Sequence, residues 1–254
     1  MPFATNSDVR IHYSVEGDGE PLVLQHGFFW SIDGWYRLGY VDALKSNYRL
    51  ILVDMRGHGA SDKPHDGRAY TLQQHVSDVT AVLDQLDIPL AHFWGFSMGG
   101  WIGFGMAKYA AQRLTSLTIG GASPYARTIP PESRPIGKDP EAFVSSFFAR
   151  MNINRADLSE DALSEFTDND FLALSASLHD RPPLEGVLPS ISVPCLLYVG
   201  ENDGLLEQVK QCAPLIPGSQ LVTLPGLNHP QSFYEAEQAL SHVVPFLDHA
   251  SIQQ

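Results

Sequence analysis

The sequence predicts an α/β protein with a mostly parallel central β-sheet flanked by helices. Short apolar runs alternate with longer amphipathic stretches, which is the pattern of strands connected by covering helices. Most of the runs are apolar throughout, as in parallel strands that are buried on both faces. The 254 residues are enough for one large core and leave room for an insertion.

Seven strands are expected in this sheet. In the first, apolar side chains alternate with polar ones, so the strand should be half exposed: Val9, Ile11, Tyr13 and Val15. The other six are continuous apolar runs at residues 21–25, 48–53, 91–94, 117–120, 194–199 and 220–224.

The clearest helix begins after Thr71, which can form a capping box with Gln74. Its apolar stripe at helical spacing consists of Leu72, Val76, Val79, Leu83 and Leu86. Pro89 should stop this helix. A further amphipathic helix is expected over residues 231–249, near the end of the chain.

The alternation of strands and helices breaks within residues 123–187. Prolines punctuate this segment and the start of the next: Pro124, Pro130, Pro131, Pro135, Pro140, Pro182, Pro183 and Pro189. Two amphipathic stretches lie between them, at 143–151 and 162–178. We interpret 123–187 as a helical insertion that covers a core made of 1–122 and 188–254, with ordinary surface helices as the alternative.

Composition and charge exclude several classes of protein. Hydrophobic residues make up 44% and charged residues 18% of the chain, unlike a disordered or coiled-coil protein. The formal net charge is −13 and no cluster of lysines and arginines interrupts it, so nucleic acid is not expected as a partner. No apolar run reaches about 18 residues, so no membrane span is expected.

The cysteines and the first residues bear on the location of the protein. Cys195 and Cys212 are too few for a disulfide framework in a chain of this length, and both are expected to be buried and inert. Residues 1–8 show neither the basic nor the apolar segment of a secretion signal. We therefore expect a cytoplasmic protein.

The sharpest local signal is Gly95-Phe96-Ser97-Met98-Gly99. It follows a predicted strand and precedes a helical pattern that begins at Ser97 or Met98 and runs toward residue 112. In this setting Gly-x-Ser-x-Gly forms a nucleophile elbow. The serine occupies a strained turn, so the residues two positions away must lack bulk. The turn raises the Ser97 hydroxyl above the sheet, at a helix N-terminus that favours negative charge.

Five motifs, in the same order along the chain, resemble those of the α/β-hydrolase superfamily, and the resemblance covers nearly the whole chain. The elbow at Ser97 is one of them. The other four are Gln25-His26-Gly27-Phe28, Asp54-Met55-Arg56-Gly57-His58-Gly59-Ala60-Ser61-Asp62, Gly200-Glu201-Asn202-Asp203 and Gly226-Leu227-Asn228-His229. The resemblance implies an α/β-hydrolase fold with a helical cap and a serine esterase that needs no cofactor.

The resemblance also assigns roles to individual residues. Ser97 is the expected nucleophile, His229 the general base and Asp203 the acid that orients the histidine. A serine hydroxyl is a weak nucleophile until a base accepts its proton, and the aspartate fixes the imidazole tautomer that can do so. The backbone N–H groups of Phe28 and Met98 are expected to form the oxyanion hole that stabilises the tetrahedral intermediate.

The position of the acid has an alternative. Asp203 could be a turn residue beside Gly204, with Glu201 as the acid, although the Gly-x-x-Asp pattern favours Asp203. The identity of the nucleophile also separates this chain from some relatives. Ser97 disfavours a likeness to haloalkane dehalogenases and epoxide hydrolases, in which the elbow residue is aspartate.

Other polar residues of the motifs are expected to be structural. His26 and His58 resemble residues that bind loop backbone, and Asp54 and Arg56 are expected to hold their loop as a hydrogen-bonded pair. The seven histidines outside the motifs should have surface or structural roles: His12, His65, His75, His92, His179, His242 and His249.

Aromatic side chains next to the expected oxyanion hole and nucleophile predict an apolar substrate pocket. The candidates are Phe29, Trp30, Phe96, Phe147 and Phe148. A place in the core is the alternative for each of them.

These observations together predict a hydrolase of carboxylic esters with small, fairly apolar substrates. Lactone, thioester and carbon–carbon bond hydrolysis and perhydrolysis are close variants, and a small-molecule receptor that kept the fold is the alternative of another class. No ligand spacing for a metal is found, so no metal is expected. The expected partner is an ester or lactone, and the sequence leaves a homo-oligomer open.

Overall fold

The computed structural model describes residues 2–129, 139–151 and 153–252. It shows an eight-stranded sheet in the order β1-β2-β4-β3-β5-β6-β7-β8. The β1–β2 and β2–β4 pairs are antiparallel and all other neighbouring pairs are parallel. The strands are β1 (Phe3–Asn6), β2 (Val9–Glu16), β3 (Glu20–Gln25), β4 (Tyr48–Val53), β5 (Ala91–Phe96), β6 (Leu114–Gly120), β7 (Cys195–Gly200) and β8 (Gln220–Leu224).

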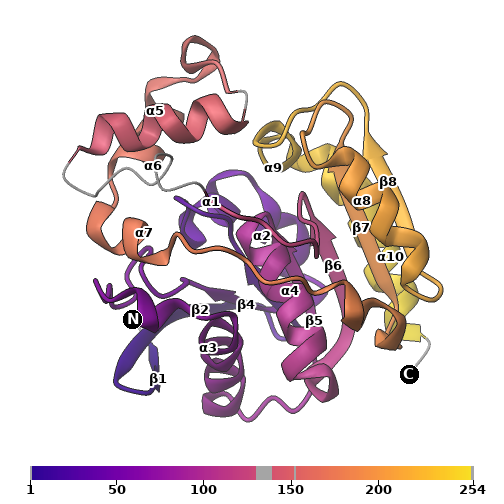
Figure 1. Ribbon diagram of the computed structural model, residues 1–254. Helices are drawn as coiled ribbons and strands as arrows, with labels where there is room; N and C mark the ends of the chain where they lie inside the picture. Colours follow the sequence, from indigo (N-terminus) through magenta and orange to yellow (C-terminus); the bar gives the residue numbers. More distant parts are fainter. Residues whose placement is uncertain (1, 130–138, 152, 253–254) are drawn as a thin grey trace.

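Helices cover both faces of this sheet (Figure 1). Two of them, α3 and α4, pack together on one face, whereas α10 packs against α2 and the strands β6 to β8 on the other. The α-helices are α1 (Ile32–Arg37), α2 (Tyr40–Leu44), α3 (Leu72–Gln85), α4 (Met98–Tyr109), α5 (Pro140–Met151), α6 (Glu160–Thr167), α7 (Phe171–Ser177), α8 (Leu206–Cys212), α9 (Gln231–Tyr234) and α10 (Ala236–Ile252). The predicted fold class is confirmed.

All seven predicted strands are present, as β2 to β8, and β1 is an additional one. The expectation that each continuous apolar run is buried on both faces is wrong for β8. This strand lies at the edge of the sheet, and of its residues only Leu224 is fully buried. An edge strand has a neighbour on one side only, so an apolar run there does not require burial.

The predicted helices also form, with shifts at their ends. Thr71 caps α3 through the expected capping box with Gln74. The helix predicted from Ser97 or Met98 is α4, which ends at Tyr109, and the predicted C-terminal helix is divided into α9 and α10 at Glu235. Both cysteines are free and buried, as expected.

Between β6 and β7 the described chain contributes the helices α5, α6 and α7 and no strand of the sheet. These helices lie beside the sheet rather than against its faces (Figure 1). The stretch predicted as amphipathic at 162–178 is divided into two helices, and Asp170 caps the second. Residues 130–138, with Pro130, Pro131 and Pro135, and residue 152 lie outside the described residues.

The two ends of this segment are joined. Arg127 and Arg181 form an antiparallel bridge in which each backbone N–H donates to the carbonyl of the other, at 3.0 and 2.8 Å. No helix within the described residues has both the length and the apolar character that crossing a lipid bilayer requires.

Candidate active site

Ser97 occupies the turn between β5 and α4. Its φ of 55° and ψ of −111° lie in a region that a residue with a side chain rarely adopts. The turn is held at both ends, because the N–H of Ser97 donates to the Gly120 carbonyl at 2.8 Å and its carbonyl accepts from Trp101 at 3.0 Å. The side chain of Ser97 remains partly exposed.

The glycines on either side of the elbow are required by close backbone approach. A Cβ atom on Gly95 would overlap the carbonyl oxygen of Gly99, and one on Gly99 would overlap the carbonyl oxygen of Gln25. The elbow therefore folds tightly on itself and against the end of β3. This agrees with the steric reason that the motif was expected to need glycine at both positions.

Ser97, His229 and Asp203 come together at the carboxyl edge of the sheet, after β5, β8 and β7 respectively. The Oγ of Ser97 lies 2.8 Å from Nε2 of His229, and Nδ1 of His229 lies 2.7 Å from Oδ2 of Asp203. A carboxylate only accepts hydrogen bonds, so the Nδ1 proton of the imidazole is donated to Asp203 and Nε2 faces the serine. Both residues behind the serine are buried, with exposed fractions of 4% for His229 and 5% for Asp203.

Glu201, the alternative acid, does not contact the histidine ring. Its Oε2 accepts the N–H of Gly226 at 2.8 Å, and the amide of Asn202 donates to the Gly226 carbonyl at 3.0 Å. The loop after β7 thus binds the loop after β8 through these two residues and places Asp203 beside His229.

The segment expected to supply an oxyanion donor lies next to Ser97. A Cβ atom on Gly27 would lie 3.2 Å from the Cβ of Ser97, so the backbone at Gly27 passes close to the serine. Phe28, Ser97 and Met98 line one small cavity of about 30 Å³. The N–H of Met98 is in the first turn of α4, where helical geometry provides no acceptor.

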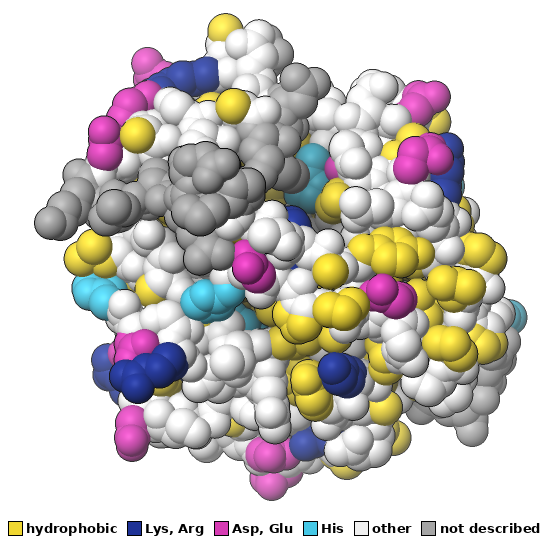
Figure 2. Space-filling view, in the orientation of Figure 1, with side chains coloured by type: hydrophobic (Ala, Val, Ile, Leu, Met, Phe, Trp, Pro, Cys, Tyr) yellow, Lys and Arg dark blue, Asp and Glu magenta, His cyan; other side chains and the backbone are white. Residues whose placement is uncertain are grey.

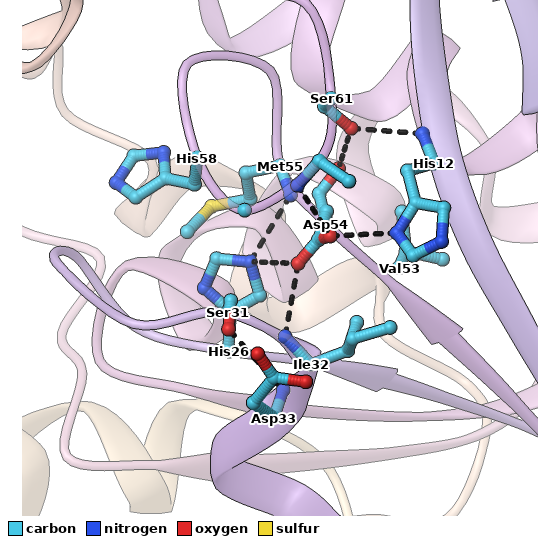
Figure 3. Close-up of polar contacts among 12 residues, drawn as sticks. His12, His26, Ser31, Ile32, Asp33, Val53, Asp54, Met55, His58 and Ser61 are labelled. Carbon is cyan, nitrogen blue, oxygen red and sulfur yellow. Dashed lines mark hydrogen bonds and ion pairs between the residues drawn. The ribbon is translucent and has the colours of Figure 1, made fainter. Parts of the chain in front are cut away.

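Asp54 holds the loop that follows β4 against its neighbours (Figure 3). Its carboxylate accepts from Nδ1 of His12 at 2.7 Å and from the N–H groups of Ile32 and Ala60, both at 2.9 Å. The prediction that Asp54 pairs with Arg56 is wrong. Arg56 instead binds both oxygens of Asp78 on α3 at 2.6 Å.

The two motif histidines bind loop backbone, as expected. His26 lies 2.8 Å from the Gly27 carbonyl through Nδ1, and its Nε2 accepts the N–H of Met55 at 3.1 Å (Figure 3). His58 lies 3.2 Å from the Arg56 carbonyl through Nδ1. Complete burial lowers the pKa of His26 and lowers that of His58 to about 3, which keeps both rings neutral near pH 7.

The five aromatic residues predicted to form a substrate pocket lie in different surroundings. Of the five candidates, only Phe147 lines a cavity that also contains Ser97. Phe29 and Trp30 line a separate cavity beside α1, and Phe96 is fully buried with its ring 5.2 Å from that of Phe233. Phe148 is also buried, with its ring 4.9 Å from that of Phe166. Phe96 and Phe148 thus pack with other aromatic rings in the core, where such pairs are favourable.

A larger cavity of about 320 Å³ adjoins the serine on the other side. It is lined by Ser97, Gly121, Ala122, Ser123, Tyr125, Ala126, Arg127, Arg181, Asn202, Asp203, Gly204, Leu205, Gln208 and His229. A hollow in the molecular surface lies between the α5–α6 region and the α8–α9 region, with histidine and cationic side chains at its base (Figure 2). Sequence reasoning missed Arg127 and Arg181, because no local pattern marks two residues that are brought together only by folding.

Among the described residues, no group of three or more histidine, cysteine, aspartate or glutamate side chains is arranged to hold a metal ion.

A mostly parallel sheet with a serine in a strained strand-to-helix turn, followed along the chain by an acid and a histidine, is typical of α/β hydrolases. The model of the alpha/beta hydrolase fold family matches residues 20–182. The chain belongs to this family.

Several other proteins can be aligned with most of this chain. A putative 2-succinyl-6-hydroxy-2,4-cyclohexadiene-1-carboxylate synthase of Bacillus subtilis is 27% identical, over 86% of this chain and 88% of its own. A putative non-heme chloroperoxidase of Synechocystis sp. is 28% identical, over 97% of this chain and 100% of its own. The solved structure of an esterase from Exiguobacterium antarcticum matches with a TM-score of 0.82 at 25% identity, over 97% of this chain and 98% of its own.

Proposed function

We propose that this protein is a serine hydrolase that cleaves small carboxylic esters through an acyl-enzyme. The observation that supports it is the continuous hydrogen-bonded chain from Ser97 through His229 to Asp203, with both distances below 3 Å. Nucleophile and base within such reach, with the base held by a third group, are the features that nucleophilic catalysis requires.

The proposed reaction has two halves. The Ser97 oxygen attacks the ester carbonyl while its proton passes to Nε2 of His229, and the proton then goes to the departing alcohol. Water, activated by the same imidazole, releases the acid and restores the serine. Asp203 holds the imidazole tautomer and stabilises its transient positive charge, while the N–H groups of Phe28 and Met98 would receive the oxyanion.

The relatives' names agree with this chemistry only in part, because they include a synthase and a chloroperoxidase as well as an esterase. Lactone, thioester and carbon–carbon bond hydrolysis and perhydrolysis on the same three residues therefore stay as variants of the proposal. We also propose that α5, α6 and α7 belong to an insertion, residues 123–187, that covers the site.

The Ser97→Ala variant tests the nucleophile. Hydrolysis of p-nitrophenyl acetate should fall at least about 10⁴-fold, and labelling by a fluorophosphonate should be lost. The thermal midpoint should change little, because the substitution removes one partly exposed oxygen. Undiminished hydrolysis by this variant would rule out Ser97 as the nucleophile. If the wild-type protein were labelled by the fluorophosphonate but turned over no ester, a receptor would be favoured instead.

A further inference from the structure

The two cavities beside Ser97 differ in size and in the residues that line them. The large cavity, of about 320 Å³, is lined by Ser97 together with His229 and Asp203. The small cavity, of about 30 Å³, is lined by Ser97 with Phe28 and Met98, and His229 is not among its described lining residues. We propose that the acyl group of the ester occupies the small cavity and its alcohol the large one, so that the preferred substrate is an acetyl-sized ester of a larger, polar alcohol. This inference rests on the proposed function.

The path of the proton decides which part of the ester lies in which cavity. As the Ser97 oxygen bonds to the carbonyl carbon, its proton passes to Nε2 of His229, 2.8 Å away. When the bond between that carbon and the alcohol oxygen breaks, the same proton goes to the alcohol oxygen. That oxygen must therefore lie within hydrogen-bond reach of the imidazole, and the alcohol extends into the cavity that His229 lines. The carbonyl oxygen would face the N–H groups of Phe28 and Met98, which leaves the small cavity for the acyl chain.

The small cavity admits only a short acyl chain. A water molecule needs roughly 10–15 Å³ of cavity, so a volume of about 30 Å³ holds about two groups of that size, as in an acetyl group. Its walls include the buried side chains of Phe28 and Leu178, each 8% exposed. The ring of Phe147, a third wall, lies 6.2 Å from that of Phe28 and 4.7 Å from that of Phe29. Because these rings pack on one another, each further methylene of the acyl chain would disturb the packing.

The large cavity can receive a polar alcohol, and its volume is within the range of small-molecule sites. Ser123 and Gln208 line it, and the Ser123 hydroxyl donates to Oε1 of Gln208 at 2.6 Å. The NH₂ group of Gln208 forms no hydrogen bond with the described residues, so its two donors can bind an acceptor on the alcohol. Gly121 keeps the space beside the imidazole open, because a Cβ atom there would lie 3.1 Å from Cε1 of His229.

Two esters of one alcohol test the acyl side in the full-length protein. We expect kcat/KM for p-nitrophenyl acetate to exceed that for p-nitrophenyl hexanoate at least about tenfold. Leu178→Ala enlarges the small cavity and should raise the hexanoate-to-acetate ratio of kcat/KM at least about tenfold, and Phe147→Ala provides the same test if that variant does not fold. The matched control is Leu163→Ala on α6, since Leu163 is partly buried and lines neither cavity. Its ratio should equal that of the wild type.

Two acetates test the alcohol side. The alcohols of 4-carbamoylphenyl acetate and 4-isopropylphenyl acetate are similar in size, and only the first carries an amide. Gln208→Leu should lower the ratio of kcat/KM for the carbamoyl ester to kcat/KM for the isopropyl ester about threefold to tenfold, the range for loss of a neutral hydrogen bond. The hexanoate-to-acetate ratio of this variant should equal that of the wild type. Gln112→Leu is the matched control, because Gln112 is exposed and lines neither cavity, and it should change neither ratio.

Hydrolysis of the hexanoate as fast as the acetate by the wild type would overturn the inference. So would an unchanged hexanoate-to-acetate ratio in both Leu178→Ala and Phe147→Ala, and an unchanged ratio of the two acetates in Gln208→Leu would refute the polar alcohol site.

Binding separates a failure of this inference from a failure of the proposed function. In calorimetric titrations of Ser97→Ala protein, 4-carbamoylphenyl acetate should bind at least about tenfold more tightly than 4-carbamoylphenyl hexanoate, whether or not any ester is hydrolysed. Equal or reversed affinities would refute the inference by themselves. The expected order of affinities, without turnover of any ester by the wild type, would support the two subsites and refute only the proposed function.

Discussion

The substitution Asp203→Asn tests the proposed role of Asp203 as the acid, because it removes a charge with little change in the size of the side chain. In the protein, Oδ2 of Asp203 accepts from Nδ1 of His229 at 2.7 Å and Oδ1 accepts from the N–H of Leu205 at 2.9 Å. The oxygen of an asparagine can keep the bond to Leu205, and its NH₂ group then faces the imidazole. A donor at that place favours the tautomer with its proton on Nε2, which cannot accept the proton of Ser97.

The expected loss is large, since His229 and Asp203 are 4% and 5% exposed and water cannot take over the role of the carboxylate. We expect kcat to fall about 10⁴-fold, equivalent to ~5 kcal/mol of transition-state stabilisation. The assay is initial-rate hydrolysis of p-nitrophenyl acetate, with circular dichroism to establish that the variant is folded.

Glu201→Gln is the matched control, because it removes a carboxylate two residues away that binds Gly226 and not the histidine ring. Its activity should stay within about tenfold of the wild type, since a neutral amide can still accept the N–H of Gly226. The reasoning is refuted if the loss appears in Glu201→Gln and Asp203→Asn is fully active.

Three further predictions concern the scaffold. Gly99→Ala should lower the free energy of unfolding by at least about 2 kcal/mol in urea titrations, since its Cβ would overlap a carbonyl of β3, whereas Gly186→Ala, with open space around it, should be near neutral. Thr71→Ala removes the cap of α3 and should cost about 1 kcal/mol, with no change in kcat/KM; a loss below the error would contradict the capping role. Burial lowers the pKa of His58 to about 3 in the folded protein, whereas in the unfolded chain it is about 6.5. Below pH 6.5 the unfolded chain therefore binds a proton that the folded protein does not, and the folded protein loses stability as the pH falls. Between pH 7 and 5 the wild type should therefore lose about 2 kcal/mol more than His58→Gln, and parallel losses would contradict this sign.

The features that sequence anticipated are those that act locally. The elbow needs glycines at fixed offsets from Ser97, and the capping box needs Thr71 and Gln74 three residues apart, so both are visible in short segments. The resemblance of the motifs likewise assigned Ser97, Asp203 and His229 to one set of residues, and in the structure these follow strands that end at the same edge of the sheet. Their hydrogen-bonded arrangement fits that expectation, while their roles await the variants above.

What sequence did not supply depends on neighbours that are distant along the chain. The burial of β8 depends on which strand lies at the edge of the sheet, and the hydrogen-bond partner of Arg56 depends on where α3 packs. The aromatic residues after Gly27 were expected in a pocket, but rings from separate segments pack against them. Arg127 and Arg181 are each unremarkable in sequence, and they become neighbours only through the backbone bridge between them.

The bridge between Arg127 and Arg181 also bears on how the sequence of such a protein can evolve. It closes the segment between β6 and β7 at its base, so substitutions, insertions or deletions beyond that point are separated from the strands that position the hydroxyl, the imidazole and the carboxylate. Under the proposed function, this segment would contribute only part of the cavity wall beside Ser97, while the reactive groups lie outside it. Exchange of the stretch between positions 127 and 181 with that of a relative offers a direct way to redirect substrate choice while the reactive groups keep their places.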